Sequence, residues 1–423
     1  MNNEELFARR SKALPRGAAT SHPIFVKRAE GAEVWDVEDK HYVDFASGIA
    51  VNNTGNLHPT IVAAIREQLN DYAHVGFPVV SYEPYLRLCE RLNDIAPIAN
   101  AKSMLLTTGA EATENAVKVA RYFTGRQGVI TFTGSFHGRT QLALAMTGKV
   151  LPLRSGVIPS QAGVFQVPFP IKHHGTSDED SLRALDHLFR ASISPEQVAA
   201  IVIEPVQGEG GFYQASKSFM QSLRAICTQH GICLVVDEVQ SGFGRTGKMF
   251  AVEHYEIEPD LIAIGKAMGG GLPLAGLIGK ADVIDSPPPG FLGGTFAGNP
   301  LACAAAHAVL DVIDSEDMLG HAEAIGSRIV DFLLALKENN DVLPVGDVRA
   351  LGAMVAFEIV TERGSNTPDA EATKVVANKA REYGLLMLPC GYYGNTIRIS
   401  TPLNIKFDVL EKGLSRLALA MKR

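Results

Sequence analysis

Two polar residues, Asp237 and Lys266, each follow closely on a short apolar run in this sequence of 423 residues. The two runs, 232–236 and 261–264, are rich in Val, Ile and Leu and are too short for helices, which indicates two buried strands. Ligands of an open α/β sheet bind at the carboxyl ends of its parallel strands. We therefore expect the carboxylate and the amine to face the same crevice.

An acid and an amine in one crevice suit one cofactor in particular. A partly desolvated lysine has a lowered pKa and can form a Schiff base with a carbonyl group. Pyridoxal phosphate requires such a lysine, together with an Asp that keeps its pyridine nitrogen protonated so that the ring accepts electrons from a carbanion. A solvated loop lysine and a helix-capping Asp are the common alternative, so this interpretation depends on other segments.

Residues 107–112 and 134–139 follow two further predicted strands and carry groups that bind anions. The first segment, TTGAEA, opens a helix, where free N–H groups and the helix dipole favour a phosphate; an ordinary capped helix start is the alternative. The second, GSFHGR, contains Phe136, which could stack on a flat cofactor, and Arg139, which could bind a carboxylate in a bidentate manner. A core Phe and a surface Arg are the alternative here.

Three more charged residues lie at or near predicted strand ends. Glu204 follows the run 200–203, and Glu209 lies in the Gly-rich loop after it. Arg398 lies within a predicted strand, and because arginine is rarely buried without a partner, its position requires an anion. One interpretation pairs these carboxylates with arginines in a cleft. The other interpretation is that the glutamates are solvated loop residues and that the arginine lies at a strand edge and reaches solvent.

These groups are positioned by an alternation of strands and helices that begins near residue 102. The alternation predicts an α/β fold with a mostly parallel central sheet covered on both faces. The end of the chain mixes strands and helices, which predicts a smaller α+β domain. We expect segment 1–55 to join the small domain, 56–310 to form the large cofactor-binding domain and 311–423 to form the small domain. Predicted strands are 103–107, 129–132, 200–203, 233–236, 261–264, 274–278, 354–359, 384–388 and 396–399; predicted helices are 4–13, 59–70, 82–95, 115–122, 217–229, 301–313, 321–337, 370–382 and 407–421; a hairpin is expected at 33–45, a loop at 47–55 and a surface excursion at 151–175.

The composition argues against several classes of protein. The net charge is −7 without a basic block, which argues against a nucleic-acid partner. The five cysteines form no CxxC pair, which indicates reduced thiols and a cytoplasmic location. The N-terminal segment lacks the apolar stretch of a signal peptide, and no apolar run approaches the ~20 residues of a membrane span, so we expect no membrane association.

Two other patterns do not predict the sites that they superficially match. Residues 242–247, GFGRTG, fit a dinucleotide or P-loop pattern, but Met249 stands where a P-loop has Ser or Thr. The glycines also lie beyond the strand-to-helix turn that a dinucleotide fingerprint occupies. The 12 histidines form no HExxH or similar cluster, so we expect no catalytic metal.

Taken together, these motifs resemble those of the class III (ω-amino acid) pyridoxal-phosphate aminotransferases, and the 4-aminobutyrate aminotransferases in particular. The resemblance covers nearly the whole chain, from residue 47 to Arg398, and implies fold type I with a large and a small domain. The motifs that carry it, in the order of the family, are TTGAEA, FHGRT, IEPVQGEGG, DEVQSGFGRTG, GKAMGGGLPL and GGTFAGNP.

The resemblance implies pyridoxal 5′-phosphate as the cofactor and a role for each matching residue. Lys266 would be the catalytic lysine that bonds the cofactor and moves the proton, and Asp237 would be the acid at the pyridine nitrogen. A homodimer or a dimer of dimers is implied, because one phosphate contact belongs to the neighbouring subunit. The other expected contacts are Gly109 and Ala110 with the phosphate, Phe136 and Val239 with the ring faces, His137 beside the ring, Gln240 with the ring hydroxyl, and Thr295 with the phosphate of the neighbouring subunit.

By the same resemblance, 4-aminobutyrate gives its amino group to 2-oxoglutarate, and the products are succinate semialdehyde and glutamate. Arg139 would hold the distal carboxylate, oriented by Glu204, and Arg398 would hold the α-carboxylate of 2-oxoglutarate. A donor without an α-carboxylate leaves Arg398 unpaired, and Glu209 would swing in to pair with it, because an unpaired buried charge costs several kcal/mol. Ile49 stands where ornithine-type relatives have Tyr, which suits 4-aminobutyrate or 5-aminovalerate.

Several alternatives stay open. The same chemistry could act on 5-aminovalerate, on another ω-amine or on N-acetylornithine. An aminomutase on the same fold would react without 2-oxoglutarate. A binding or regulatory protein on this scaffold is a non-enzymatic alternative, against which the presence of both Asp237 and Lys266 argues. A nicotinamide-dependent dehydrogenase is a further alternative, and it is supported by the GFGRTG match alone.

Overall fold

The computed structural model describes residues 1–157 and 163–423, and a seven-stranded sheet forms its largest layer. Across this sheet the strand order is β4-β10-β9-β8-β7-β5-β6. The neighbours from β9 to β6 are parallel, whereas β10 is antiparallel to both β4 and β9. The predicted α/β class with a mostly parallel sheet is confirmed. The strands are β4 (Ala101–Leu106), β5 (Gly128–Phe132), β6 (Val164–Val167), β7 (Val198–Ile203), β8 (Cys233–Asp237), β9 (Leu261–Ile264) and β10 (Ala275–Lys280).

The edge strand β6 is the strand of this sheet that the sequence pattern does not predict. It lies within 151–175, where we expect a surface excursion, and residues 158–162 of that segment lie outside the described residues. Only its last residue, Val167, is fully buried, because an edge strand is covered on fewer sides than a central one. A strand of four residues with mixed burial carries neither a continuous apolar run nor a clear alternation.

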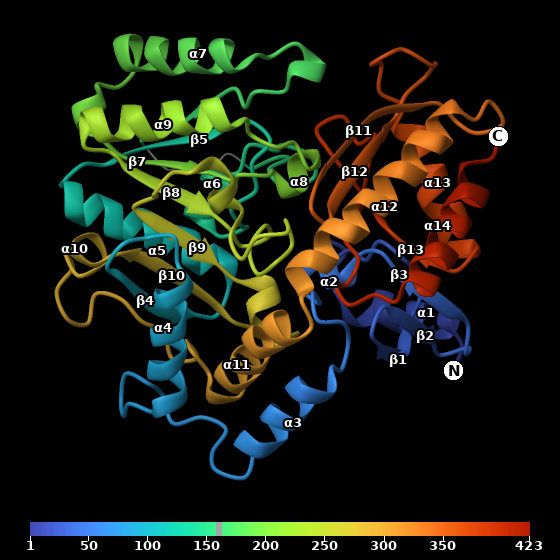
Figure 1. Ribbon diagram of the computed structural model, residues 1–423, viewed down its shortest axis with the longest axis horizontal. Coiled ribbons are helices and arrows are strands. Elements are labelled where there is room, and N and C mark those ends of the chain that lie inside the picture. Colours follow the sequence, from blue (N-terminus) through green and yellow to red (C-terminus); the bar gives the residue numbers. More distant parts are fainter. Residues whose placement is uncertain (158–162) are drawn as a thin grey trace.

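Alternate side chains of the central strands pack against helices on opposite faces of the sheet. On β8, Cys233 and Val235 share a core with α5 (Gly109–Thr124), whereas Leu234 and Val236 share a core with α9 (Lys217–His230). Successive strand residues point to opposite faces, so a sheet covered on both faces needs apolar residues at every position. Figure 1 shows α9 along one face of the sheet and α7 (Asp178–Ala191) stacked outside it.

The remaining helices around this sheet connect its strands or extend from its edge. Helix α11 packs against α3 and α4 at the lower end of the molecule in Figure 1. These helices are α3 (Pro59–Gln68), α4 (Glu83–Ile95), α6 (Gln141–Met146), α8 (Gly208–Gly211), α10 (Ala281–Ile284) and α11 (Pro300–Ser315).

Two four-stranded sheets form the other side of the molecule, and both chain termini lie there (Figure 1). Strand β13 pairs in parallel with β3, so the N-terminal and C-terminal segments share one sheet. This pairing supports the expected union of segments 1–55 and 311–423, whose boundaries stay a prediction. The strands are β1 (Val26–Glu30), β2 (Glu33–Asp36), β3 (His41–Asp44), β11 (Val345–Leu351), β12 (Met354–Ile359), β13 (Leu385–Leu386), β14 (Leu388–Cys390) and β15 (Thr396–Ile399); the helices are α1 (Asn3–Ala13), α2 (Ser47–Ala50), α12 (Met318–Glu338), α13 (Ala370–Glu382) and α14 (Phe407–Met421).

The segment GFGRTG is a packed connection between the large sheet and the C-terminal part. Arg245 is fully buried and donates hydrogen bonds to the carbonyl oxygen of Thr401, at 2.6 Å, and to Asn53. Burial lowers the pKa of Arg245 to about 9. A Cβ atom on Gly247 would overlap the side chain of Glu323. Gly244 and Gly247 have φ of 86° and 82°, in the left-handed region that glycine adopts without strain, which explains these two glycines. None of the helices in the described ranges has the length and apolar character of a membrane span.

Candidate active site

A cavity of about 270 Å³ opens at the carboxyl ends of the central strands. It contains almost all residues that the motifs single out, although they come from five separate stretches of the chain. The residues that line it are Gly109, Ala110, Phe136, His137, Gly138, Arg139, Glu204, Glu209, Asp237, Val239, Gln240 and Lys266.

The parallel strands bring these residues together. Glu204 directly follows β7, Asp237 is the last residue of β8, and Lys266 comes two residues after β9. Because β7, β8 and β9 are neighbours with the same direction, their carboxyl ends lie side by side. The spacing of strand ends in the sequence was therefore enough to predict that the acid and the amine share one crevice.

Lys266 begins the 3₁₀ turn η4 (Lys266–Gly269) with a backbone φ of 46°, in the left-handed region. For a residue other than Gly this conformation costs about 1–3 kcal/mol, and such strain is concentrated at functional sites. Burial lowers the pKa of the Lys266 amine to about 8; the charge of Glu209 opposes this shift and that of Arg398 adds to it. The neutral, nucleophilic amine is thus accessible near neutral pH.

Asp237 and His137 form a buried pair, with 2.7 Å between Oδ2 of Asp237 and Nδ1 of His137. The other carboxylate oxygen accepts the N–H of Val239 at 3.0 Å. Burial lowers the pKa of His137, but the hydrogen bond and charge of Asp237, with the charge of Glu204, outweigh it and the net shift is upward. Nε2 of His137 is buried and has no partner among the described residues, which leaves a polar atom available at the cavity.

The N-terminus of α5 borders the cavity. Thr108 caps the helix, and its hydroxyl accepts the N–H of Glu111 at 3.3 Å while the Glu111 carboxylate accepts the N–H of Thr108 at 3.0 Å. The ordinary capped helix start, which was the alternative to a phosphate site at this segment, is therefore present. It leaves the N–H groups of Gly109 and Ala110, which have no carbonyl partner within the helix, for an anion.

Two glycines let the backbone close tightly around this cavity. A Cβ atom on Gly109 would lie 2.8 Å from Cγ1 of Val239, and one on Gly208 would lie 1.9 Å from Oε1 of Gln240. Pyridoxal phosphate requires an anion site, an acid, a reactive amine and apolar contacts for its ring. The helix terminus, Asp237, Lys266 and the side chain of Val239 provide them around one cavity, so the residues fit the predicted cofactor.

Glu204 contacts the backbone rather than Arg139. Its carboxylate accepts the N–H groups of Phe136 and Gly208, both at 2.8 Å. Burial raises the pKa of Glu204 to about 7, His137 lowers it and Asp237 raises it further. Within the described residues Arg139 makes no ion pair and is exposed, so the orientation of Arg139 by Glu204 stays a prediction.

Arg398 and Glu209 are paired, with 2.6 Å between Nη1 and Oε1. The Arg398 side chain is 7% exposed and that of Glu209 is 25% exposed. Burial raises the pKa of Glu209, but the charge of Arg398 and its hydrogen bond outweigh this, so the pKa lies below its ordinary value. Arg398 reaches the cavity through this partner and does not line it.

Besides Arg398, two predicted site residues, Ile49 and Thr295, do not line the cavity of this single chain. Ile49, in α2, is 47% exposed and has φ 67° and ψ 55°, which is an unusual conformation for a β-branched side chain. The expected loop at 47–55 thus contains a short helical turn with left-handed residues. Thr295 is exposed and does not line the cavity.

Sequence reasoning did not assign Gly138, Gly208 or Lys149 to the site. Gly138 lines the cavity, and a Cβ there would lie 2.6 Å from Cβ of Ala110. The ammonium group of Lys149 donates to the carbonyl oxygen of Glu209 at 3.2 Å. The two glycines lie in recognised motifs, whereas Lys149 lies outside them, just before the segment 151–175, and has no such signal.

Comparison with known proteins gives one consistent family. The family model "Aminotransferase class-III" matches residues 15–421. The chain is 50% identical to the 4-aminobutyrate aminotransferase of Escherichia coli and 49% identical to the 5-aminovalerate aminotransferase of Pseudomonas putida, in each case over 98% of this chain and 97% of the relative. Among solved structures, taurine:2-oxoglutarate aminotransferase from Bifidobacterium kashiwanohense, in complex with pyridoxal phosphate and glutamate, is similar with a TM-score of 0.90 and 28% identity, covering 99% of this chain and 97% of that chain.

Proposed function

The chain belongs to the class III aminotransferases, and from that premise we propose that it transfers the amino group of 4-aminobutyrate to 2-oxoglutarate. The protein is a pyridoxal-phosphate enzyme of fold type I, and it acts on an amino donor and a 2-oxo acid acceptor. The observation that carries the proposed donor is the ion pair of Glu209 with Arg398, because it neutralises an arginine that a donor without an α-carboxylate cannot cover.

The cofactor supplies a carbonyl group that bonds amines and a ring that accepts the electrons of the C–H bond to be broken. We assign its phosphate to the N–H groups of Gly109 and Ala110, and its pyridine nitrogen to the carboxylate of Asp237. Apolar contacts with the ring fall to Phe136 and Val239, and the ring hydroxyl to Gln240. His137 holds one carboxylate oxygen of Asp237 in place and so orients the acid.

Lys266 holds and moves the proton. Its neutral amine would hold the cofactor through the carbonyl group, and with substrate bound the same amine would take a proton from the substrate carbon. Burial supports this role, because it lowers the pKa of Lys266 to about 8 and brings the amine close to the operating pH. The carboxylate of Asp237, held by His137, would face the ring nitrogen of the cofactor.

The two arginines hold carboxylates in the two half-reactions. We assign the carboxylate of the ω-amino donor, and the distal carboxylate of 2-oxoglutarate, to Arg139, which lines the cavity. Arg398 takes the α-carboxylate of 2-oxoglutarate, for which Glu209 has to leave. With 4-aminobutyrate the Glu209–Arg398 pair stays closed, which avoids a buried unpaired charge.

We further propose that the active unit is a homodimer or a dimer of dimers, in which Thr295 binds the phosphate of the partner's site. Support comes from the segments 74–80 and 295–296, which contact each other. The rings of His74 and Phe296 lie 5.1 Å apart, and apolar side chains are exposed on both segments. Such patches mark protein interfaces. Sedimentation should give at least twice the mass of one chain, and Phe296→Glu should shift it toward the monomer. The exposed residues are Val75, Val79, Val80 and Phe296.

A titration of the purified protein tests the proposed reaction. The visible absorbance of bound cofactor should fall when 4-aminobutyrate is added, because the cofactor takes up the amino group. It should return with 2-oxoglutarate, because the acceptor removes that group. Lys266→Ala should show no multiple turnover. Turnover that persists in Lys266→Ala, or no absorbance after addition of pyridoxal phosphate, would contradict the assignment.

The second candidate donor is 5-aminovalerate. Relatives named for this activity are 49% identical to the chain, almost as similar as those named for 4-aminobutyrate. The two donors differ by one methylene group, which in an apolar pocket is worth about 1–3 kcal/mol. Parallel titrations with both donors, ornithine and glutamate decide between them. A cytoplasmic location agrees with five cysteines that are all buried and free.

A further inference from the structure

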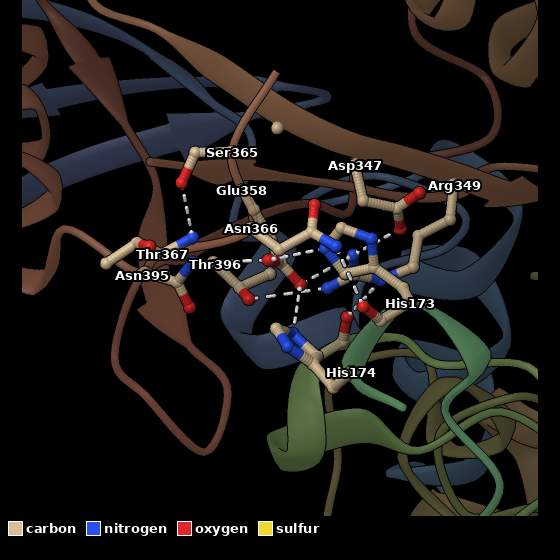
Figure 2. A network of polar contacts seen from close by, with 12 residues as sticks. His173, His174, Asp347, Arg349, Glu358, Ser365, Asn366, Thr367, Asn395 and Thr396 are labelled. Atoms are coloured by element: carbon tan, nitrogen blue, oxygen red, sulfur yellow. Dashed lines mark hydrogen bonds and ion pairs between the residues drawn. The ribbon is translucent and has the colours of Figure 1, made fainter. Parts of the chain in front are cut away.

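A network of polar side chains lies behind the Glu209–Arg398 pair, outside the cavity. Figure 2 shows it where the green segment around His173 and His174 meets the brown strands of the C-terminal part. The central group is Glu358 on β12, whose side chain is fully buried. Its Oε1 accepts the hydroxyl of Tyr213 and the guanidinium of Arg349, the latter at 3.1 Å, and its Oε2 accepts Asn395 at 3.2 Å.

The two histidines complete the set of contacts around Glu358. Nε2 of His173 lies 3.2 Å from Oε2, and Nε2 of His174 lies 3.3 Å from Oε1. Two imidazoles and a carboxylate within 4.8 Å of one another have the composition of a metal site. However, the positive charge of Arg349 lies against the same carboxylate oxygen, which would repel a cation there. The cluster is therefore an ion-pair network, in which Glu358 balances the charge of Arg349.

Arg349 connects this network to both residues of the Glu209–Arg398 pair. Its Nε donates to the carbonyl oxygen of Gly211 at 2.7 Å, at the end of the turn α8 that carries Glu209. Its Nη2 lies 3.3 Å from Oγ1 of Thr396, which shares one face of β15 with Arg398. One planar guanidinium thus holds the turn and the strand at a fixed separation.

Several further contacts keep Arg349 in this position. Nη1 donates to Asp347 at 2.7 Å as well as to Glu358, and the guanidinium lies 3.9 Å from the centre of the Tyr213 ring. The Arg349 side chain is only 11% exposed. Residue Gly211 in the held turn has φ 127°, and a Cβ there would lie 3.2 Å from Nη2 of Arg349. A rigid guanidinium with several fixed partners is suited to set distances, which a flexible lysine cannot reproduce.

We propose that Arg349, held by Glu358, is a positioning residue that places Glu209 against Arg398 and so sets the selectivity for donors without an α-carboxylate. This inference rests on the proposed function. With an ω-amino donor the closed pair is needed, and a loosened α8 weakens it. With glutamate the substrate carboxylate pairs with Arg398 and Glu209 is displaced, so a loosened turn costs little.

The test compares the ratio of kcat/KM for 4-aminobutyrate to that for glutamate in wild type and variants. Arg349→Lys keeps the charge but cannot reach Gly211, Thr396 and Glu358 together, and we expect the ratio to fall about tenfold. Thr396→Val removes one acceptor with little change in shape and should lower the ratio about threefold. This milder variant carries the test if Arg349→Lys does not fold.

A double-mutant cycle separates positioning from general damage. In a Glu209→Ser background, Arg349→Lys should leave the ratio unchanged, because the carboxylate to be positioned is gone. Arg224→Lys is the matched control, since Arg224 forms a similar partly buried ion pair with Asp260, at 2.7 Å, on the other side of the molecule. It should not change the ratio.

An equal fall in kcat/KM for both substrates in Arg349→Lys, or the same change of ratio in the Glu209→Ser background, would overturn the inference and leave the proposed function intact. A wild type that reacts with neither 4-aminobutyrate nor 5-aminovalerate would overturn both.

Discussion

The carboxylate of Glu209 lies 2.6 Å from the guanidinium of Arg398, although the two residues are 189 positions apart in the sequence. Glu209 sits on a four-residue turn that follows β7, and Arg398 sits on a strand of a different sheet. The pair therefore forms at the contact between the large sheet and the C-terminal part. We therefore expect a change in that contact to alter which carboxylates the site accepts.

Loss of the Glu209 carboxylate should reduce the use of ω-amino donors selectively. In Glu209→Ser, kcat/KM for 4-aminobutyrate should fall about 30-fold, because Arg398 is left unpaired at a cost of about 2 kcal/mol for a partly exposed pair. The value for glutamate should change little, since its own carboxylate pairs with Arg398. Steady-state kinetics with both donors measure this. Equal selectivity in wild type and variant would disprove the switch.

The reactivity of Lys266 should depend on pH in a defined direction. Burial lowers the pKa of its amine to about 8, and only the neutral amine attacks a carbonyl group. The rate at which cofactor-free protein takes up pyridoxal phosphate should therefore rise with pH, reach half of its maximum near pH 8 and level off above it, as followed by stopped-flow absorbance.

The variant Glu209→Ser provides a control for that profile. The Glu209 carboxylate raises the pKa of Lys266, so its removal should move the plateau to lower pH. A rate that still rises at pH 10 in the wild type would show an ordinary, solvated lysine.

A methyl group at Gly109 should weaken cofactor binding. The Cβ of Gly109→Ala would lie 2.8 Å from Cγ1 of Val239, so the start of α5 or Val239 has to move. Because the N–H groups at this terminus are assigned to the phosphate, the Kd for pyridoxal phosphate should rise about tenfold. Gly17→Ala is the control, as a Cβ there meets nothing within 4 Å. An unchanged Kd, measured by fluorescence titration, would contradict the assignment.

The raised pKa of His137 should depend on Asp237. Burial alone lowers this pKa, and the hydrogen bond and charge of Asp237 are the largest opposing effects. In the wild type His137 should titrate above 6.5, and in Asp237→Asn below it. The pair thus favours folding below the ordinary pKa of histidine, and this contribution is lost as the pH rises through the folded-state value. Nitrogen NMR of labelled histidines, with His137→Gln for assignment, measures the change.

Much of the large sheet could be predicted from the sequence because each central strand is buried on both faces. Runs such as Ala200–Ile203 and Leu261–Ile264 therefore carry a signal within four residues. β6 carries no such signal, since an edge strand is only partly covered. The start of α5 at Gly109, rather than at the predicted position 115, follows from the Thr108 cap, whose motif we interpreted as a phosphate site.

The residue types and their order along the chain determined the chemistry. Asp237 and Lys266 each follow a buried strand, and parallel strands place their carboxyl ends at one edge, so local patterns were sufficient for this part of the site. The tertiary structure decided which distant groups meet: Glu204 with the backbone of the loop after β5, and Glu209 with Arg398. The ion pair of Arg349 with Glu358 was likewise decided by the tertiary structure. Local patterns depend on neighbours two to four residues away, whereas such contacts depend on how whole sheets pack, which no short segment encodes.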